Sequence, residues 1–300
     1  MSIEFVRERS FETNGLTLKA KEWGRSGSLP VIALHGWLDN AATFDRMLPF
    51  MDNLNVVALD LAGHGLSSHR SVDATYDIWM DVGEVMAVAD QMGWDRFAII
   101  GHSRGAIISG LIAGTFPDRV SHVVLIDGYV PMPQAADSAA KQLAKAIREN
   151  NRFGASSPTF FHDFDRAVQA RVNGFVPLEF DAAALLATRG VSEGPRGFYW
   201  ASDQRLKAAS YTKYSVEHLK SFFVAIVARV MLIQAGNSAF SPDRQQSELF
   251  EWIPQMEILK LPGSHHLHLE AQAEDVAKKA QAFLNSRGFH ECFAILCKEA

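Results

Sequence analysis

Short, uniformly apolar segments alternate with helix-period segments through the first part of this chain, and this alternation constrains the fold more than any other feature. Uniformly apolar runs are typical of strands whose two faces are both covered by helices, as in a parallel sheet built from strand-helix units. The pattern therefore predicts an α/β fold with a mostly parallel sheet flanked by helices. The expected strands are 16–23, 31–34, 56–59, 97–100 and 123–126, and the expected helices are 41–51, 78–92 and 104–115.

The alternation stops between Tyr129 and about Ala228, where helix-like segments follow one another and are separated by proline and glycine. It resumes with an expected strand at 230–234, a helix near 243–252, a strand at 256–261 and a helix at 270–286. We therefore expect a core formed by residues 1–128 and 229–287, a helical cap inserted at 129–228, and a tail at 288–300.

The composition is that of a globular enzyme or binding protein. The chain has 300 residues, of which 48% are hydrophobic and 21% are charged, so it can form a large core. The formal net charge is −5 and the basic residues are scattered, which argues against nucleic-acid and anionic-membrane partners. No apolar run is long enough to span a membrane, and residues 1–11 lack the apolar region of a signal peptide. Because both cysteines, Cys292 and Cys297, lie in the tail, we expect no disulfide in the core and a cytoplasmic location.

A serine stands between two glycines where one expected strand meets one expected helix. The sequence Gly-His-Ser-Arg-Gly, centred on Ser103, lies between the apolar run 97–100 and the apolar stretch 106–113. This context is that of the G-x-S-x-G nucleophile elbow, in which glycines allow the sharp turn. The bare pattern also occurs in ordinary glycine-rich loops, so Ser103 needs partners before it predicts chemistry.

The first partner is a histidine, because a serine hydroxyl is a weak nucleophile unless a base accepts its proton and an acid orients that base. In folds with this elbow, the base lies on a loop after the last strand. The segment 264–270 occupies that place and offers His265, His266 and His268. The three imidazoles could also bind a metal ion, but without nearby acidic ligands we expect no metal site.

The acid should follow the end of a strand near that histidine loop, and two strand ends qualify. After the strand 230–234, enzymes of this type commonly place an aspartate three residues after the glycine, but this position is Ala239, which cannot orient an imidazole. Asp127 follows the expected strand at 123–126. We therefore choose Asp127 as the acid and keep Asp243 in reserve. The alternative is that Asp127 only braces its own loop.

Acyl transfer also develops an oxyanion, which preorganised backbone N–H groups must stabilise. One donor is expected at Arg104, directly after the nucleophile, where the helix begins. The other is expected at Trp37, in the loop 35–40 that follows an earlier strand. The Trp37 side chain could also be an ordinary core aromatic.

Several ordered features of the chain resemble the α/β-hydrolase superfamily, and most closely its serine hydrolase-like branch. They are His35 and Gly36 after a strand, Asp60 with Gly63, His64 and Gly65, the elbow around Ser103, the segment 203–206 in the insertion, and the late histidine loop 262–268. We expect Asp60 and His64 to support the site and not to react. The chain departs from this family at Ser202, which stands where relatives often have arginine.

The resemblance also selects among the candidates for the base and the acid. In this family, the base is the histidine five residues before the position of Glu270, which selects His265. The resemblance supports Asp127 as the substitute for the acid that is missing at Ala239.

The insertion is rich in aromatic side chains, and in such folds it lies over the nucleophile as a lid. They are Phe153, Phe160, Phe161, Phe164, Phe175, Phe180, Phe198, Tyr199, Trp200, Phe222 and Phe223. Helical aromatics also occur in cores, but if several of these line a pocket, a small to medium apolar ester is the expected substrate.

We therefore expect a serine hydrolase that acts on a small molecule through Ser103, His265 and Asp127, forms an acyl-enzyme and needs no cofactor. Carbon–carbon bond hydrolases, thioesterases and amidases use the same triad, and a non-catalytic binding protein can retain the same fold. A serine at the elbow argues against epoxide hydrolases and haloalkane dehalogenases, which use an aspartate there.

Overall fold

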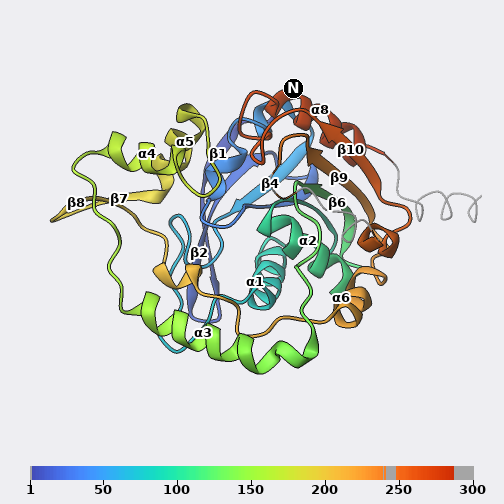
Figure 1. Cartoon of the computed structure of the whole chain (residues 1–300). Coiled ribbons are helices and arrows are strands. Elements are labelled where there is room, and N and C mark those ends of the chain that lie inside the picture. Colours follow the sequence, from blue (N-terminus) through green and yellow to red (C-terminus); the bar gives the residue numbers. More distant parts are fainter. Residues whose placement is uncertain (1, 239, 241–247, 287–300) are drawn as a thin grey trace, which may run out of the picture.

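The computed structural model describes residues 2–238, 240 and 248–286, and it contains one large sheet (Figure 1). The eight strands of this sheet follow the order β1-β2-β4-β3-β5-β6-β9-β10. Their bounds are β1 (Phe5–Thr13), β2 (Leu16–Gly24), β3 (Leu29–Leu34), β4 (Leu54–Leu59), β5 (Phe97–His102), β6 (Val120–Ile126), β9 (Arg229–Ala235) and β10 (Glu257–Leu261). The β2 strand is antiparallel to β1 and β4, and all the other pairings are parallel. The expected α/β class with a mostly parallel sheet is confirmed.

Helices cover both faces of this sheet. One face packs against α1 (Ile78–Gln91), α2 (Arg104–Thr115) and α6 (Val216–Phe223), and the other against η1 (Ala41–Phe44), η2 (Leu48–Phe50) and α8 (Ala273–Leu284). Successive residues of β3 alternate between the two buried layers, with Ile32 and Leu34 in one and Val31 and Ala33 in the other. This two-sided burial explains why the strand segments are uniformly apolar. Among the described helices, none is long and apolar enough to cross a membrane.

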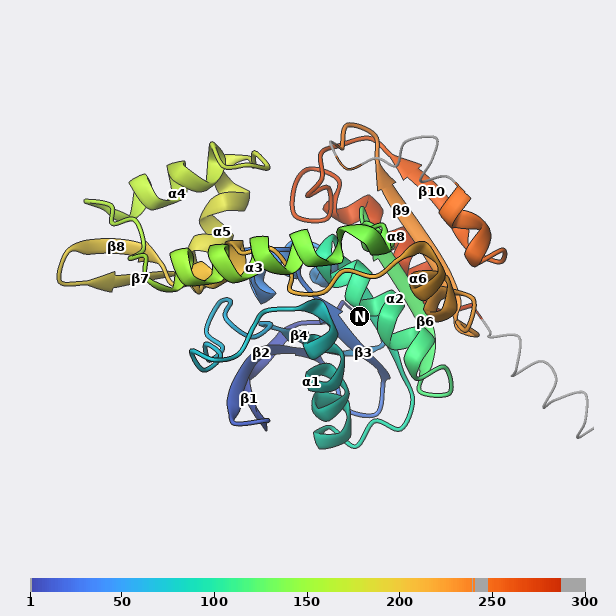
Figure 2. The same ribbon diagram turned by 60° about the horizontal axis from the view of Figure 1, so that its bottom comes forward.

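The segment between β6 and β9 is mainly helical. It contains η3 (Ala136–Ser138), α3 (Ala139–Gly154), α4 (Phe164–Val172), α5 (Phe180–Gly190), a hairpin of β7 (Val191–Gly194) and β8 (Gly197–Trp200), η4 (Gln204–Lys207) and α6. In Figures 1 and 2, α4, α5 and the hairpin lie together at one side of the sheet, and α6 lies at the other. Leu219 and Phe223 of α6 are buried in the same layer as α2. The division of the chain into core and cap stays a prediction.

Three local features differ from the sequence expectations. The edge strand β1 was not expected, because it has alternating exposed charges and no apolar run. The segment 41–51 forms two short 3₁₀ turns, and Pro49 at the start of the second one cannot continue an α-helix from the first. The β7–β8 hairpin turns at Pro195 and Arg196, and its four-residue strands are too short to give a clear periodic pattern.

Two other sequence expectations concern segments that the structure describes only in part. Of the helix expected near 243–252, only η5 (Glu248–Trp252) lies in the described part, and it is a 3₁₀ helix. Ala239, Asp243 and the tail 288–300 with its two cysteines lie outside the described residues.

The parallel arrangement brings the candidate residues together at the carboxyl ends of the central strands. Trp37 follows β3, Ser103 follows β5 and Asp127 follows β6, and these three strands are neighbours in the order β3-β5-β6. Because parallel strands point in the same direction, their carboxyl ends meet at one edge, where α/β folds place their ligands.

Alanine substitutions at two helix glycines test how tightly α6 packs against α2. Gly114 lies in that contact, and Gly83 in α1 is the control. A Cβ at Gly114 of α2 would lie 2.1 Å from the carbonyl oxygen of Phe222, whereas a Cβ at Gly83 of α1 would meet nothing within 4 Å. Gly83→Ala should therefore raise the free energy of unfolding by about 0.5–1 kcal/mol, because alanine favours the helix. Gly114→Ala should lower it by about 1–3 kcal/mol, because the backbone of α6 must move. Urea unfolding measures both, and equal stabilisation by the two variants would contradict the close packing.

Candidate active site

Ser103 stands in a strained turn between β5 and α2. Its backbone has φ of 51° and ψ of −114°, a conformation that residues other than glycine rarely adopt. A Cβ at Gly101 would lie 2.4 Å from the Gly105 carbonyl oxygen, and a Cβ at Gly105 would lie 2.0 Å from that of Leu34. Both glycines are therefore required by close backbone approach, and the turn has the geometry expected of a nucleophile elbow.

His265 and Asp127 form a direct buried pair. Nδ1 of His265 lies 2.6 Å from Oδ2 of Asp127, and the Ala235 amide donates a hydrogen bond of 2.9 Å to Oδ1. Burial by itself raises the pKa of the Asp127 carboxyl, but the hydrogen bonds that it accepts, first from His265 and then from Ser238, hold this pKa below its usual value. An ionised Asp127 accepts a hydrogen bond from the Nδ1–H group, and this tautomer leaves Nε2 of His265 unprotonated and able to act as a base.

Ser103 lies beside this pair without being bonded to it. A Cβ at Gly128, the residue after Asp127, would lie 2.4 Å from the Ser103 carbonyl oxygen, so the two segments touch. The structure has no hydrogen bond between the described side chains of Ser103 and His265. Catalytic hydrogen bonds are often long in ligand-free proteins and tighten when substrate binds.

The two expected oxyanion donors lie at neighbouring strand ends. Arg104 is the first residue of α2, so its amide has no partner within the helix. In the described part of the chain, neither this amide nor that of Trp37 donates a main-chain hydrogen bond. The side chains hold both residues in place, since Trp37 Nε1 donates to the Leu206 carbonyl (2.8 Å) and Arg104 binds Asp81 (2.8 Å).

The other motif residues brace the loops around the site. The Nδ1–H group of His35 donates to the Gly36 carbonyl oxygen (2.7 Å), and Nε2 accepts from the Leu61 amide (3.0 Å). Asp60 is fully buried and accepts hydrogen bonds from the Ala41 amide and from Arg189. These bonds occupy both side chains, so neither is available to react.

The chain matches a known protein family over most of its length. A model of the alpha/beta hydrolase fold family matches residues 30–272. This chain belongs to that family. The chain is 29% identical over 287 residues to serine hydrolase-like protein 2 of Homo sapiens. This alignment covers 89% of this chain and 90% of the relative. It is 30% identical over 277 residues to the serine hydrolase-like protein of Mus musculus, with 83% and 86% covered.

A solved structure is also similar along the chain. The hypothetical protein PA1622 from Pseudomonas aeruginosa PAO1 superposes with a TM-score of 0.90 at 37% identity, and covers 94% of this chain and 100% of its own. The resemblance to the serine hydrolase-like branch of the alpha/beta hydrolases is confirmed.

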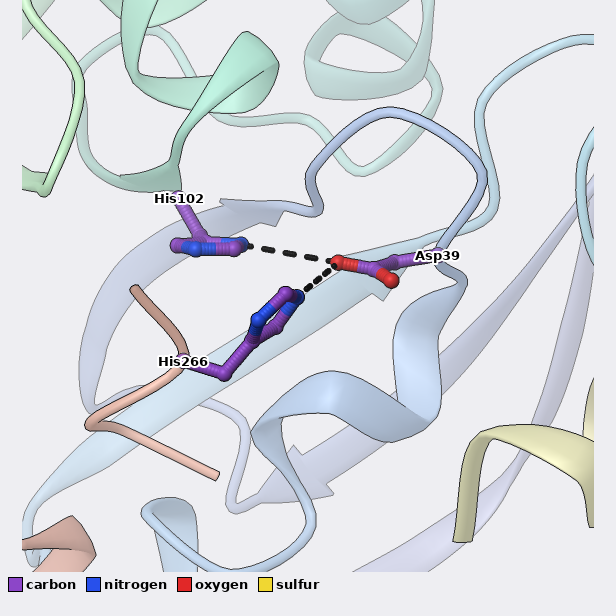
Figure 3. A group of neighbouring side chains, drawn as sticks. All are labelled: Asp39, His102 and His266. Atoms are coloured by element: carbon purple, nitrogen blue, oxygen red, sulfur yellow. Dashed lines mark hydrogen bonds and ion pairs between the residues drawn. The ribbon is translucent and has the colours of Figure 1, made fainter. Parts of the chain in front are cut away.

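A buried cluster that the sequence did not predict lies beside the candidate triad. Of its residues, only His266 was considered from the sequence, as a candidate base or metal ligand. Figure 3 shows Asp39, His102 and His266 with their side chains converging. Asp39 Oδ2 lies 3.0 Å from Nε2 of His266 and 3.6 Å from Nδ1 of His102. Arg171 of α4 binds the other carboxylate oxygen at 3.0 Å. One feature of the sequence could have indicated this cluster, because two of its residues adjoin candidate catalytic residues. His102 precedes Ser103, and His266 follows His265.

Geometry alone would allow this cluster to hold a metal ion. The ligand atoms of Asp39, His102 and His266 lie within 4.8 Å of one another, and such sets can bind transition metals. However, the Arg171 guanidinium already supplies a positive charge, 3.0 Å from Asp39 Oδ1 and 3.4 Å from His266 Nε2. We therefore interpret the group as a hydrogen-bonded cluster around a buried carboxylate.

The three histidines of the late loop have separate partners. His265 binds Asp127, His266 binds Asp39, and Nε2 of His268 lies 2.9 Å from the Thr43 hydroxyl. Their rings all lie within 4.8 Å of the His102 ring, between centroids, but their polar atoms bind different partners.

The aromatic residues of the insertion lie in several different environments. Phe153, Phe160, Tyr199 and Trp200 line a cavity of about 670 Å³ whose described lining does not include Ser103 or His265. Phe223 is instead fully buried against α2, with Phe222 packed beside it. Nearer to the base, the Phe240 ring lies 4.6 Å from that of His265 and 6.3 Å from that of Phe175, between ring centroids.

The two acid candidates can be separated by mutation. Asp127→Asn should lower kcat for a p-nitrophenyl ester by about 10⁴-fold, because a neutral amide stabilises neither the required histidine tautomer nor its protonated form. Asp243→Asn should leave kcat nearly unchanged. Steady-state kinetics measures both variants, and a large loss in Asp243→Asn alone would refute the choice of Asp127.

Proposed function

We propose that this protein is a serine hydrolase that cleaves a small to medium apolar ester through Ser103, His265 and Asp127. The observation that carries this proposal is the 2.6 Å contact between Asp127 and His265 beside the strained turn at Ser103. The serine hydrolase-like relatives, which align over most of the chain, support the same reaction class.

The reaction follows from the orientation of His265. Because Nδ1 of its ring is bound to Asp127, Nε2 takes the proton from the Ser103 hydroxyl as its oxygen attacks the ester carbonyl carbon. The Trp37 and Arg104 amides then stabilise the oxyanion of the tetrahedral intermediate. Its collapse breaks the bond to the alkoxy oxygen, which takes the proton from His265 and leaves as the alcohol. Water attacks the acyl-enzyme by the same route, releases the acid and restores Ser103.

An apolar substrate is supported by the side chains near the base. Phe240 is 47% exposed although its ring lies against His265, and Phe175, from the loop between α4 and α5, is 81% exposed. Exposed aromatic rings beside a candidate site offer contact area to an apolar group, whose transfer from water is favourable.

A lid role for the insertion is supported by its bonds to the site loops. Trp37 binds the Leu206 carbonyl of η4, and Arg171 of α4 binds Asp39. Glu270, after the histidine loop, accepts a hydrogen bond of 3.0 Å from the Glu179 amide. The insertion is therefore joined to both loops that flank Ser103.

Labelling of the nucleophile tests the reaction class. A fluorophosphonate probe should label the wild-type protein at Ser103, and Ser103→Ala should abolish both labelling and ester hydrolysis, because no other oxygen is activated there. Ser121→Ala is a matched control, since that hydroxyl binds the Phe97 carbonyl at the opposite end of the strands. Mass spectrometry locates the label. A wild-type protein that is neither labelled nor active would favour a binding protein.

A substrate panel tests the bond that is cleaved. We expect the highest kcat/KM for p-nitrophenyl esters of short to medium acyl chains, because the exposed aromatic rings near His265 offer contact area to an apolar acyl group. Thioesters, amides and vinylogous diketones of matched size should be cleaved more slowly. Faster turnover of any of these would reassign the substrate class while keeping the triad.

A further inference from the structure

The three segments that carry the candidate catalytic groups meet at one carboxylate. His102 directly precedes Ser103, His266 directly follows His265, and Asp39 lies two residues after Trp37. Figure 3 shows the two histidine side chains pointing at Asp39 from two different segments. The nearest neighbours of the nucleophile and the base are therefore in contact with the loop that carries an oxyanion donor.

The contacts around Asp39 are short and buried. The side chains of Asp39, His102 and His266 are all 2% exposed or less. Asp39 Oδ2 lies 3.0 Å from His266 Nε2, and Oδ1 accepts a hydrogen bond of 3.0 Å from Arg171. A fourth segment, helix α4, thus reaches the same carboxylate.

His102 also contacts the base loop directly. Its Nε2 lies 3.0 Å from the main-chain carbonyl oxygen of His265, and since a carbonyl can only accept, Nε2 carries the proton and donates it. Burial lowers the pKa of His102 to about 3, so the ring is neutral and this N–H is its one donor. Nδ1, which faces Asp39 at 3.6 Å, has no hydrogen-bond partner in the described part of the chain.

The charge of Asp39 is held in place by its neighbours. Burial by itself raises the pKa of this carboxyl, but His266 and Arg171 outweigh burial and hold the pKa well below the usual value. A buried anion with fixed partners resists displacement, because a partner that moves away leaves a charge uncompensated in a low dielectric.

We propose that Asp39 is a positioning residue which, through its hydrogen bonds with His266 and Arg171, fixes the base loop against the oxyanion loop, while His102 bonds the nucleophile elbow to the same base loop. This proposal rests on the serine hydrolase function proposed above. Ser103 and His265 are not hydrogen-bonded in the free protein, so their alignment depends on the segments that carry them. Small errors in such alignment are costly, since a misplacement of about 1 Å can reduce a rate by about 100-fold.

The test is the variant Asp39→Asn, which keeps the size of the side chain and removes its charge. We expect kcat and the rate of fluorophosphonate labelling to fall by about 10-fold to 100-fold while KM changes by less than about 3-fold, because alignment affects the chemical step. The matched control is Glu22→Gln. Glu22 lies on β2, and its buried carboxylate is paired with Arg7 of the neighbouring strand β1 (2.7 Å). This control should leave both rates unchanged. A kcat within twofold of wild type in Asp39→Asn would overturn the proposal.

A second pair of variants separates positioning from general loss of structure. In His266→Gln, the side-chain amide of the glutamine can still donate a hydrogen bond to Asp39. In His266→Leu, the leucine side chain has no donor. We expect His266→Gln to retain most of the wild-type kcat, and His266→Leu to lose as much as Asp39→Asn, at similar Tm. Equal kcat losses in both His266 variants would contradict a role through Asp39.

One measurement of the positioning role does not depend on enzymatic activity. In ¹⁵N NMR spectra of the folded variants, the ring nitrogen signals of His265 should shift in Asp39→Asn and stay unchanged in Glu22→Gln. Unchanged His265 signals in Asp39→Asn would overturn the positioning role whatever the reaction. A wild-type protein without labelling or hydrolysis would instead refute the proposed function, and the NMR comparison would still decide the role of Asp39.

Discussion

The turn at Ser103 depends on three places where the backbone leaves no room for a side chain. Gly101 faces the first turn of α2, Gly105 lies against the end of β3, and Gly128 lies against Ser103 itself. Since each of these contacts is with backbone, no side-chain rearrangement could relieve a clash. The resulting close packing of β3, α2 and the loop after β6 brings Trp37, Ser103 and Asp127 to one edge of the sheet.

Buried arginine–aspartate pairs join the insertion to this edge. Arg171 of α4 binds Asp39, and Arg189 of α5 binds Asp60, which lies at the end of β4. Buried ion pairs of this kind add little net stability, because removing both charges from water offsets their attraction. Their effect is to favour one arrangement, since a displaced insertion would remove the arginine that compensates each buried carboxylate. The position of the insertion and the order of the site loops are thus set by the same contacts.

Local sequence was informative where one segment contains the whole signal. The strands β3 to β6 and the helices α1 and α2 lie close to their expected bounds, because uniform apolar runs and glycine-flanked turns are local features. The β1 strand was missed because its stability comes from pairing with β2, which its own charged sequence does not indicate. The expected helix at 41–51 was interrupted because Pro49 acts against an otherwise favourable pattern.

The sequence by itself determined which side chains are available to the candidate site. They are a serine in an elbow, three late histidines and an aspartate after a strand. Their contacts depend on the order of strands in the sheet. Asp127 meets His265 across 138 residues because β6 and β9 are parallel neighbours, and this pairing places the end of β6 next to the loops that follow β9 and β10. The positions of His102 and His266 beside candidate residues were visible in the sequence, but their convergence with Arg171 on Asp39 was not, because each residue comes from a different segment. Only the folded chain, in which burial makes an unpaired carboxylate costly, brings them together.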